Sequence, residues 1–155
     1  MKNFSTLILI LLLGITVLAQ DDIKDKEAIK HVILTAYVDG LQNNGDLDAT
    51  RTGFHPGFEL LIFRNDMMDK FPIYNWIRYK EMGKAKNPDP LPEDELTHCD
   101  FEFIDITGTA AVAKIHLFKG GKKIFTDYLS LYKFNEGWKI VSKIYFEIPH
   151  KEDKN

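Results

Sequence analysis

Apolar residues recur every three or four positions from Asp22 to Gln42, and charged residues occupy the positions between them. This spacing predicts an amphipathic helix. Its apolar stripe consists of Ile29, Val32, Ile33, Ala36, Tyr37 and Leu41. The helix should end at Asn43-Asn44-Gly45, because these residue types tolerate the left-handed conformation that terminates helices.

A second, short helix is expected directly after this turn. Asp46 is a suitable N-terminal cap, and the helix should run to about Thr52. Gly53 and the His55-Pro56 pair then interrupt it, since the residue before a proline is biased toward extended geometry.

The next segment predicts a strand followed by a third helix. Residues 58–63 are apolar enough for a mostly buried strand, and residues 64–66 form a polar break. Pro72 suits the first turn of a helix, whose apolar stripe would contain Ile73, Trp76 and Ile77. A proline-rich loop at 87–92 follows.

The remainder of the chain has the composition of β-structure. Aromatic and β-branched residues dominate four segments, with glycines between them, at 96–107, 110–119, 122–134 and 138–148. Consecutive hairpins are the simplest interpretation. Helices followed by strands indicate an α+β domain, with the helices packed on one face of a curved antiparallel sheet.

The first nineteen residues predict a signal peptide. Lys2 precedes an apolar run from Leu7 to Leu18, and Ala19 provides a small residue for cleavage. The run is shorter than the roughly 20 residues of a membrane span and is followed by acids, which argues against an anchor. We therefore expect export to the periplasm or the medium, a single domain at 20–150, and a charged tail at 151–155.

Composition narrows the possible chemistry. The net charge is −3, without a basic cluster, so nucleic acid is not an expected partner. Cys99 is the single cysteine and excludes an intramolecular disulfide. The five histidines lack the paired spacing of zinc sites, and no glycine-rich phosphate loop is present, so neither a metal nor a cofactor is expected.

Three short motifs join these elements: the start of the second helix at Gly45-Asp46-Leu47-Asp48, the turn at Phe54-His55-Pro56 and the last strand at Gly137-Trp138-Lys139-Ile140-Val141. In the order of its elements and motifs, the chain resembles the nuclear transport factor 2-like superfamily. The chain looks closest to the branch described as "putative lumazine-binding". This resemblance implies a cone-shaped curved sheet wrapped by three helices, an internal cavity, and a homodimer formed through the outer sheet face. The superfamily contains both enzymes and non-enzymes, so the fold leaves the chemistry open.

Within that superfamily, ketosteroid isomerase offers the sharpest comparison. Tyr37 lies in the same relation to the Gly-Asp-Leu-Asp restart as the isomerase's tyrosine, which implies a hydrogen-bond donor to a ligand. The position of its catalytic base corresponds to Ile62, which cannot transfer a proton. The position of its second acid falls near Leu129, and Asp127 is the nearest carboxylate on the same face.

His55 could replace the missing base if its imidazole faces the cavity. The alternative is a structural corner in which the imidazole bonds nearby backbone groups. A two-residue loop at Gly120-Gly121 would place Lys114 opposite Asp127, with His116 diagonal to it. This group is either a polar site in the cavity or an ion pair on the outer face.

Most aromatic residues must build the core, and some should line a pocket. Trp76 and Tyr145 are our choices for its mouth. The predicted ligand-binding residues are therefore Tyr37, His55, Trp76, His116, Asp127 and Tyr145, and the catalytic candidates are Tyr37, His55 and Asp127.

Three functional hypotheses follow. The leading one is an exported, dimeric binder of a small apolar or aromatic molecule. The second is an enzyme similar to SnoaL-type cyclases or isomerases, which would transfer protons on a small cyclic substrate. The third is a protein-interaction module whose pocket is plugged by aromatic side chains.

Overall fold

A computed structural model describes residues 22–149 of the 155-residue chain. The expected signal peptide (1–19) and charged tail (151–155) lie outside these residues, so both stay predictions. Within residues 22–149, no helix combines the length and apolar character needed to cross a bilayer.

Three helices and six strands make up the described part of the chain. The first helix begins by residue 22, is α-helical to residue 32, and continues as the wider π-helix η1 (Ile33–Gln42). The remaining helical elements are α2 (Leu47–Gly53), α3 (Ile73–Lys86) and the single turn η2 (Glu93–Glu95). The strands are β1 (Phe54–Arg64), β2 (Met67–Pro72), β3 (Thr97–Thr107), β4 (Ala110–Lys119), β5 (Lys122–Phe134) and β6 (Gly137–Glu147).

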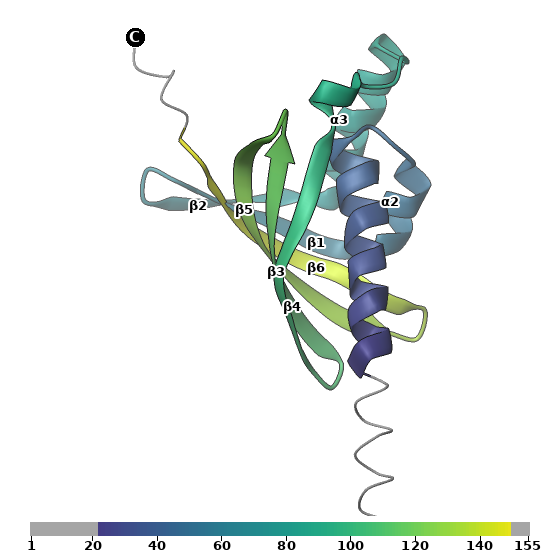
Figure 1. Ribbon diagram of the computed structural model, residues 1–155, viewed down its shortest axis with the longest axis vertical. Helices are drawn as coiled ribbons and strands as arrows, with labels where there is room; N and C mark the ends of the chain where they lie inside the picture. The colour runs from purple at the N-terminus through teal and green to yellow at the C-terminus, as the bar shows by residue number, and fades with distance from the viewer. Residues whose placement is uncertain (1–21, 150–155) are drawn as a thin grey trace, which may run out of the picture.

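The strands form one curved, open sheet in the order β2-β1-β6-β5-β4-β3, and the first helix and α2 cover one of its faces (Figure 1). The expected α+β architecture is confirmed. The sheet is mixed, however, because β1 runs parallel to β6 while every other neighbouring pair is antiparallel.

Strand β2 is the one strand that the sequence did not predict. The polar break contains Asn65 and Asp66 with φ of 50° and 62°, and these residues make the tight turn of a β1–β2 hairpin. The third helix, expected to start near Pro72, is present, but a strand that the sequence did not reveal lies between it and the polar break. Helix α3 begins only at Ile73, and Pro72 precedes it as its N-terminal cap.

The core lies between the helices and the inner face of the sheet. Its fully buried members come from the first helix, β1 and the central strands, and they include Ile33, Tyr37, Phe58, Ile115, Leu129 and Ile140. Asn43 connects the helix to the sheet, because its side-chain amide donates to the Thr97 carbonyl (3.0 Å) and accepts from the Thr97 amide (2.7 Å). At the other end of the helix, Asp25 accepts a hydrogen bond from the indole of the buried Trp138 (3.0 Å).

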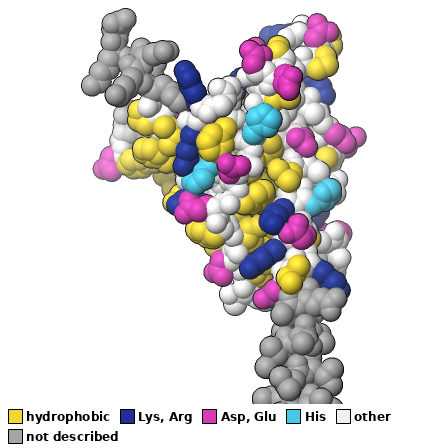
Figure 2. All heavy atoms as spheres, in the orientation of Figure 1, with side chains coloured by type: hydrophobic (Ala, Val, Ile, Leu, Met, Phe, Trp, Pro, Cys, Tyr) yellow, Lys and Arg dark blue, Asp and Glu magenta, His cyan; other side chains and the backbone are white. Residues whose placement is uncertain are grey.

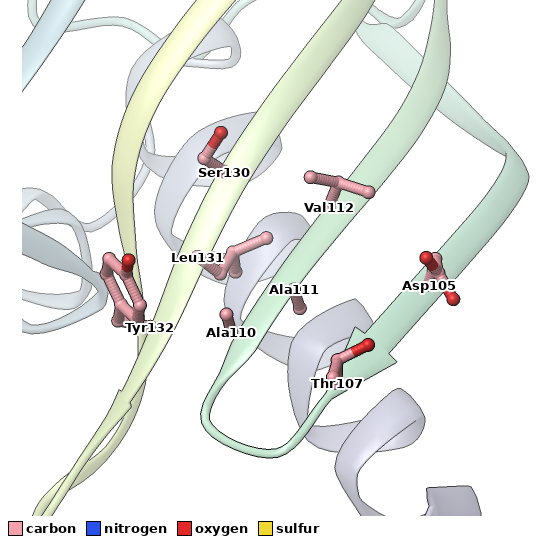
Figure 3. A pocket seen from close by; sticks show the side chains of 8 residues that line it. All are labelled: Asp105, Thr107, Ala110, Ala111, Val112, Ser130, Leu131 and Tyr132. Atoms are coloured by element: carbon pink, nitrogen blue, oxygen red, sulfur yellow. The ribbon is translucent and has the colours of Figure 1, made fainter.

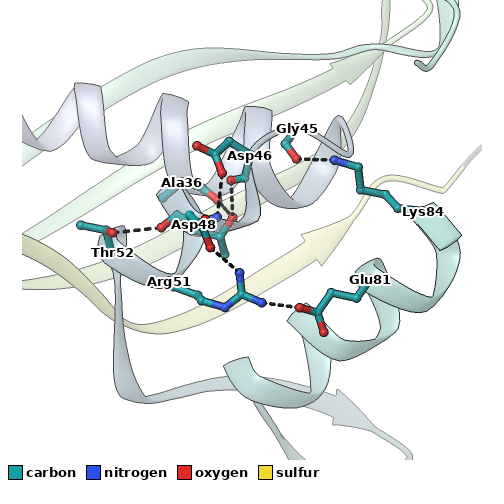
Figure 4. A network of polar contacts seen from close by, with 9 residues as sticks. Ala36, Gly45, Asp46, Asp48, Arg51, Thr52, Glu81 and Lys84 are labelled. Carbon is teal, nitrogen blue, oxygen red and sulfur yellow. Dashed lines mark hydrogen bonds and ion pairs between the residues drawn. The ribbon is translucent and has the colours of Figure 1, made fainter. Parts of the chain in front are cut away.

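Polar contacts hold α2 against α3 (Figure 4). Arg51 pairs with Asp48 on its own helix (2.7 Å) and with Glu81 on α3. Lys84, one turn further along α3, donates to the Gly45 carbonyl (2.9 Å). These contacts fix the position of α3, which carries Trp76, relative to the first helix.

The first helix and α2 approach so closely that Gly40 has no room for a side chain. A Cβ at this position would lie 2.1 Å from the Thr50 hydroxyl oxygen and 3.0 Å from the Asp46 carbonyl oxygen. Thr50 is fully buried and cannot move away, because its hydroxyl donates to the Ala36 carbonyl (2.9 Å).

We predict that Gly40→Ala lowers the free energy of unfolding by about 1–3 kcal/mol, the usual cost of overpacking a core. Gly83→Ala is the matched control, since Gly83 is an exposed α3 residue with open space around it. There, alanine should raise stability by about 0.5–1 kcal/mol through its helix propensity. Urea unfolding measures both changes, and equal effects at the two glycines would contradict the close approach.

Candidate functional site

Three polar side chains meet in the interior of the protein. The carboxylate of Asp127 accepts a hydrogen bond from the Tyr37 hydroxyl (2.6 Å) and an ion-paired hydrogen bond from Lys143 (2.7 Å). Lys143 also donates to the Tyr37 oxygen. Tyr37 and Asp127 have no exposed surface, and Lys143 is 5% exposed. We call Tyr37, Asp127 and Lys143 the buried triad.

Each member of the triad comes from a different element. Tyr37 lies in the π-helical segment η1, Asp127 on β5 and Lys143 on β6. Asp127 is paired with Tyr145 across the two strands, and Lys143 is paired with Leu129. Lys143 therefore reaches Asp127 diagonally, on the sheet face that meets the helix.

Aromatic rings surround the ammonium group of Lys143. Its nitrogen lies 4.6 Å from the ring centroid of Tyr37, 5.2 Å from that of Tyr145, 5.7 Å from that of Trp76 and 6.0 Å from that of Phe125. Ring faces attract cations electrostatically, most strongly where water is excluded. The rings and Asp127 together compensate for the removal of this charge from water.

A cavity of about 230 Å³ adjoins the triad. Its lining contains the four rings and Lys143, together with Gln42, Leu60 and Glu147. An apolar cavity of about 150 Å³ holds benzene, whereas drug-sized ligands occupy roughly 300–1,000 Å³. The cavity next to the triad therefore fits a molecule of one or two rings.

Burial shifts the titration of two triad members. Burial raises the pKa of Tyr37 well above its usual value, and the neighbouring charge of Asp127 raises it further. Burial also lowers the pKa of Lys143, and this effect outweighs the opposing influence of Asp127. Tyr37 is thus a neutral hydrogen-bond donor at physiological pH, and Lys143 gives up its proton more readily than a surface lysine.

The triad leaves hydrogen-bonding capacity unused. A lysine ammonium has three N–H donors, and the contacts to Asp127 and Tyr37 account for two of them. The second carboxylate oxygen of Asp127, Oδ1, is buried and has no hydrogen-bond partner among the described residues. Unsatisfied groups of this kind are costly and rare in folded proteins, and they often mark functional positions.

The structure brings together four of the six residues predicted to bind ligand. Tyr37, Trp76 and Tyr145 line the cavity, and Asp127 lies directly beneath it, bonded to Tyr37 and Lys143. Asp127 shares the inner face with Leu129, as the alternation of side chains predicted.

His55 and His116 are not among the residues that line this cavity. His55 stacks on Phe134 with 4.9 Å between ring centroids, and its Nδ1 accepts a hydrogen bond from the Gly57 amide (3.0 Å). This is the structural corner that we gave as the alternative. His116 instead contacts Glu102 (2.9 Å) and the Thr126 hydroxyl (3.1 Å).

The predicted register that placed Lys114 opposite Asp127 was wrong. The Gly120-Gly121 turn and the Phe118–Lys123 pair occur as expected, but the register then shifts by one residue at Ile124. Asp127 is consequently paired with Ile115 and faces inward. Lys114 faces outward and forms its ion pair with Glu102 (2.8 Å).

Lys143 is the functional candidate that the sequence did not reveal. Strict alternation along β6 from the inward-facing Trp138 and Ile140 would point Lys143 toward solvent. The β5–β6 register shifts between Ser130 and Leu131, and this places an extra residue, Val141, on β6. That bulge turns Lys143 inward, and sequence periodicity contains no signal for it.

Other hollows lack this combination of groups. One of about 290 Å³ lies on the outer face of the sheet around Val112, Ser130 and Tyr132 (Figure 3). Larger ones lie between α2 and α3 (about 440 Å³) and beside the first helix (about 620 Å³). None of the three is lined by a buried charged side chain.

Two further observations concern metal and thiol chemistry. Residues 22–149 contain no group of three or more histidine, cysteine, aspartate or glutamate side chains placed to hold a metal ion. Burial, followed by the charges of Asp100 and Asp127, raises the pKa of Cys99 to about 12. The reactive form of cysteine is the thiolate, so this thiol is inert near neutral pH.

Comparison with known proteins identifies relatives of the chain. Residues 24–146 match the family described as "Putative lumazine-binding". Among solved structures, an NTF2-like protein of unknown function from Shewanella baltica has 27% sequence identity and a TM-score of 0.63, over 83% of this chain and 97% of that one. No curated protein matches significantly.

Two more distant structures share the fold. An NTF2-like protein of unknown function from Methylobacillus flagellatus has 22% identity and a TM-score of 0.59, over 81% of this chain and 94% of that one. One from Silicibacter pomeroyi has 16% identity and a TM-score of 0.61, over 84% and 98%. NTF2-like denotes the nuclear transport factor 2-like superfamily.

We predict strong energetic coupling within the triad. Asp127→Asn or Lys143→Met alone should cost about 3–5 kcal/mol of unfolding free energy, because each leaves a buried charge without its partner. The double variant should be more stable than the sum of the single effects implies, by about 1–3 kcal/mol.

The matched control is the exposed pair Lys114–Glu102. Breaking it by Lys114→Met should cost no more than about 1 kcal/mol, since exposed ion pairs contribute little. Urea unfolding of all four variants provides the comparison. Additive effects of Asp127→Asn and Lys143→Met would show that the two groups do not form a pair in solution.

Proposed function

The chain belongs to the "Putative lumazine-binding" family of the nuclear transport factor 2-like superfamily, and we propose from this premise that it binds a flat, uncharged compound of one or two rings in the cavity above the buried triad. The observation that carries the proposal is the pocket itself. About 230 Å³ of space is bounded by aromatic rings and by a buried lysine with a free donor.

The walls of the cavity favour a planar ligand. Tyr37 and Trp76 meet edge to face, with 6.0 Å between their centroids, and Phe125 and Tyr145 do so at 5.6 Å. The rings of a ligand can make similar offset or edge contacts with these side chains, each contributing about 0.5–1.5 kcal/mol beyond buried area.

The polar groups favour a ligand with a ring carbonyl. The third N–H of Lys143 requires an acceptor, and a carbonyl oxygen supplies one. Asp127 already neutralises Lys143, and Glu147 adds a negative charge to the lining, so an anionic ligand gains little. Lumazine, which the family description names, is a flat two-ring compound with ring carbonyls and belongs to this chemical class.

The open cavity also bears on the hypothesis of an interaction module. That hypothesis requires the aromatic side chains to plug the interior, whereas the rings here stand around an unfilled volume. This favours a binder of small molecules.

Dimerisation and export remain parts of the proposal. The outer sheet face exposes apolar side chains, including Phe103, Tyr128, Tyr132, Ile144 and Phe146, and a second copy of the chain could cover them. Further apolar side chains, Phe63, Met67 and Met68, are exposed on the β1–β2 hairpin, and Figure 2 shows hydrophobic surface on that flank of the sheet. Sedimentation tests the dimer, and N-terminal sequencing of the exported chain tests cleavage near Ala19.

We predict that lumazine or 2-naphthol raises the melting temperature of the protein, because a ligand that binds only the folded state stabilises it. Trp76→Ala should weaken the binding about tenfold or more, since it removes one aromatic wall. Titration followed by calorimetry or by chemical-shift changes measures the affinity.

Tyr74→Ala is the matched control. Tyr74 lies on the same helix but lines the cavity between α2 and α3. If this variant loses binding while Trp76→Ala retains it, the ligand occupies the other cavity and the proposed site is wrong. Failure of both probes and of related ring compounds to change the melting temperature would overturn the function itself.

A further inference from the structure

Lys143 has the surroundings of an amine that reacts with carbonyl groups. Its nitrogen lines a cavity large enough for an aromatic ring, and the residue is 5% exposed. Lysines that form Schiff bases are typically desolvated in apolar surroundings, since burial favours the neutral, nucleophilic amine. Burial lowers the pKa of Lys143 in this way.

We propose that Lys143 forms a reversible covalent imine with a small aromatic aldehyde or ketone that enters the cavity. The proposal rests on the proposed function, because it concerns the same cavity and one chemical class of its ligands. It goes further because it assigns a covalent step to Lys143 and proton-transfer roles to Asp127 and Tyr37.

The neighbouring groups can carry the protons that this reaction moves. Asp127 lies 2.7 Å from the ammonium nitrogen and can accept a proton from it, which frees the nitrogen lone pair. The lone pair attacks the carbonyl carbon, and the electrons of the C=O π bond move to oxygen, which takes up a proton. Tyr37, hydrogen bonded to both Lys143 and Asp127, can relay protons between them and that oxygen.

The second half of the reaction releases water. The nitrogen forms a double bond to carbon while the C–O bond breaks, and the oxygen departs with two hydrogens that came from the ammonium group. The sum is an ammonium and a carbonyl compound giving a protonated imine and one water molecule. No oxidant, reductant or further reactant is required.

The net charge of the site stays the same through all steps of the reaction. One positive charge on nitrogen is present before and after, so Asp127 serves as counter-ion to the ammonium and then to the protonated imine. The rings of Tyr37, Trp76 and Tyr145, which lie within 5.7 Å of the nitrogen, attract either cation. The features that hold a buried lysine therefore also stabilise its imine.

The test uses benzaldehyde and sodium cyanoborohydride, which reduces a protonated imine to a stable benzylamine. The folded protein is treated at neutral pH, digested, and mapped by mass spectrometry. We expect Lys143 to carry at least tenfold more benzyl modification than any other lysine. In urea this preference should disappear, because all lysines then have similar surroundings.

Two variants separate the site from surface chemistry. Lys122→Met removes an exposed hairpin lysine and should leave the modification of Lys143 unchanged. Asp127→Asn keeps the size of the side chain but removes the proton acceptor and counter-ion, so modification of Lys143 should fall at least tenfold. A circular dichroism spectrum like that of the unaltered protein shows that this variant is folded.

Benzyl alcohol distinguishes the covalent proposal from the proposed function, because it occupies similar space and cannot form an imine. If benzaldehyde and benzyl alcohol both raise the melting temperature but Lys143 stays unmodified, the imine is overturned and non-covalent binding stands. Modification spread evenly over the surface lysines also overturns the imine. If neither compound changes the melting temperature and Lys143 is unmodified, both proposals fail.

Discussion

The ion pair between Lys143 and Asp127, with Tyr37 bonded to both, is the interaction on which the arrangement of this protein depends. It joins the first helix to the two adjacent strands β5 and β6 at a point with almost no solvent exposure. Removing two charges from water is costly, and well-packed apolar residues often stabilise a core equally well. The triad therefore suggests a selected chemical role, and the cavity beside it supplies a reason for one.

Irregularities in the strands position these groups more than the regular alternation does. An extra residue at Ile124 turns Asp127 inward, and another at Val141 turns Lys143 inward. Each bulge moves every side chain after it to the opposite face of the sheet, up to the next irregularity in the strand. Because both bulges lie between the hairpin turns and the triad, they leave the ends of the strands where the turns predict them.

The sequence accordingly predicts which segments form helices and strands better than it predicts the side of the sheet on which each side chain lies. Helix spacing, the Asp46 cap, the apolar runs and the glycine turns located three helices and five of the six strands, since these signals are local. Tyr37 could be found because helical periodicity placed it on the buried stripe. Lys143 could not, because its direction depends on a bulge specified by pairing between strands. The β1–β2 hairpin was missed because its turn uses Asn65 and Asp66 in a left-handed conformation instead of glycine.

The triad also limits which ligands the cavity can accept. Its members carry one positive and one negative charge, and an anionic ligand that drew Lys143 away would leave Asp127 as a buried, unpaired carboxylate, which is costly. A cationic ligand would approach the ammonium group itself. A neutral carbonyl compound avoids both costs, because it can accept the free N–H while the ion pair stays intact. Protonated-imine formation meets the same condition, since the nitrogen beside Asp127 carries one positive charge both before and after the reaction.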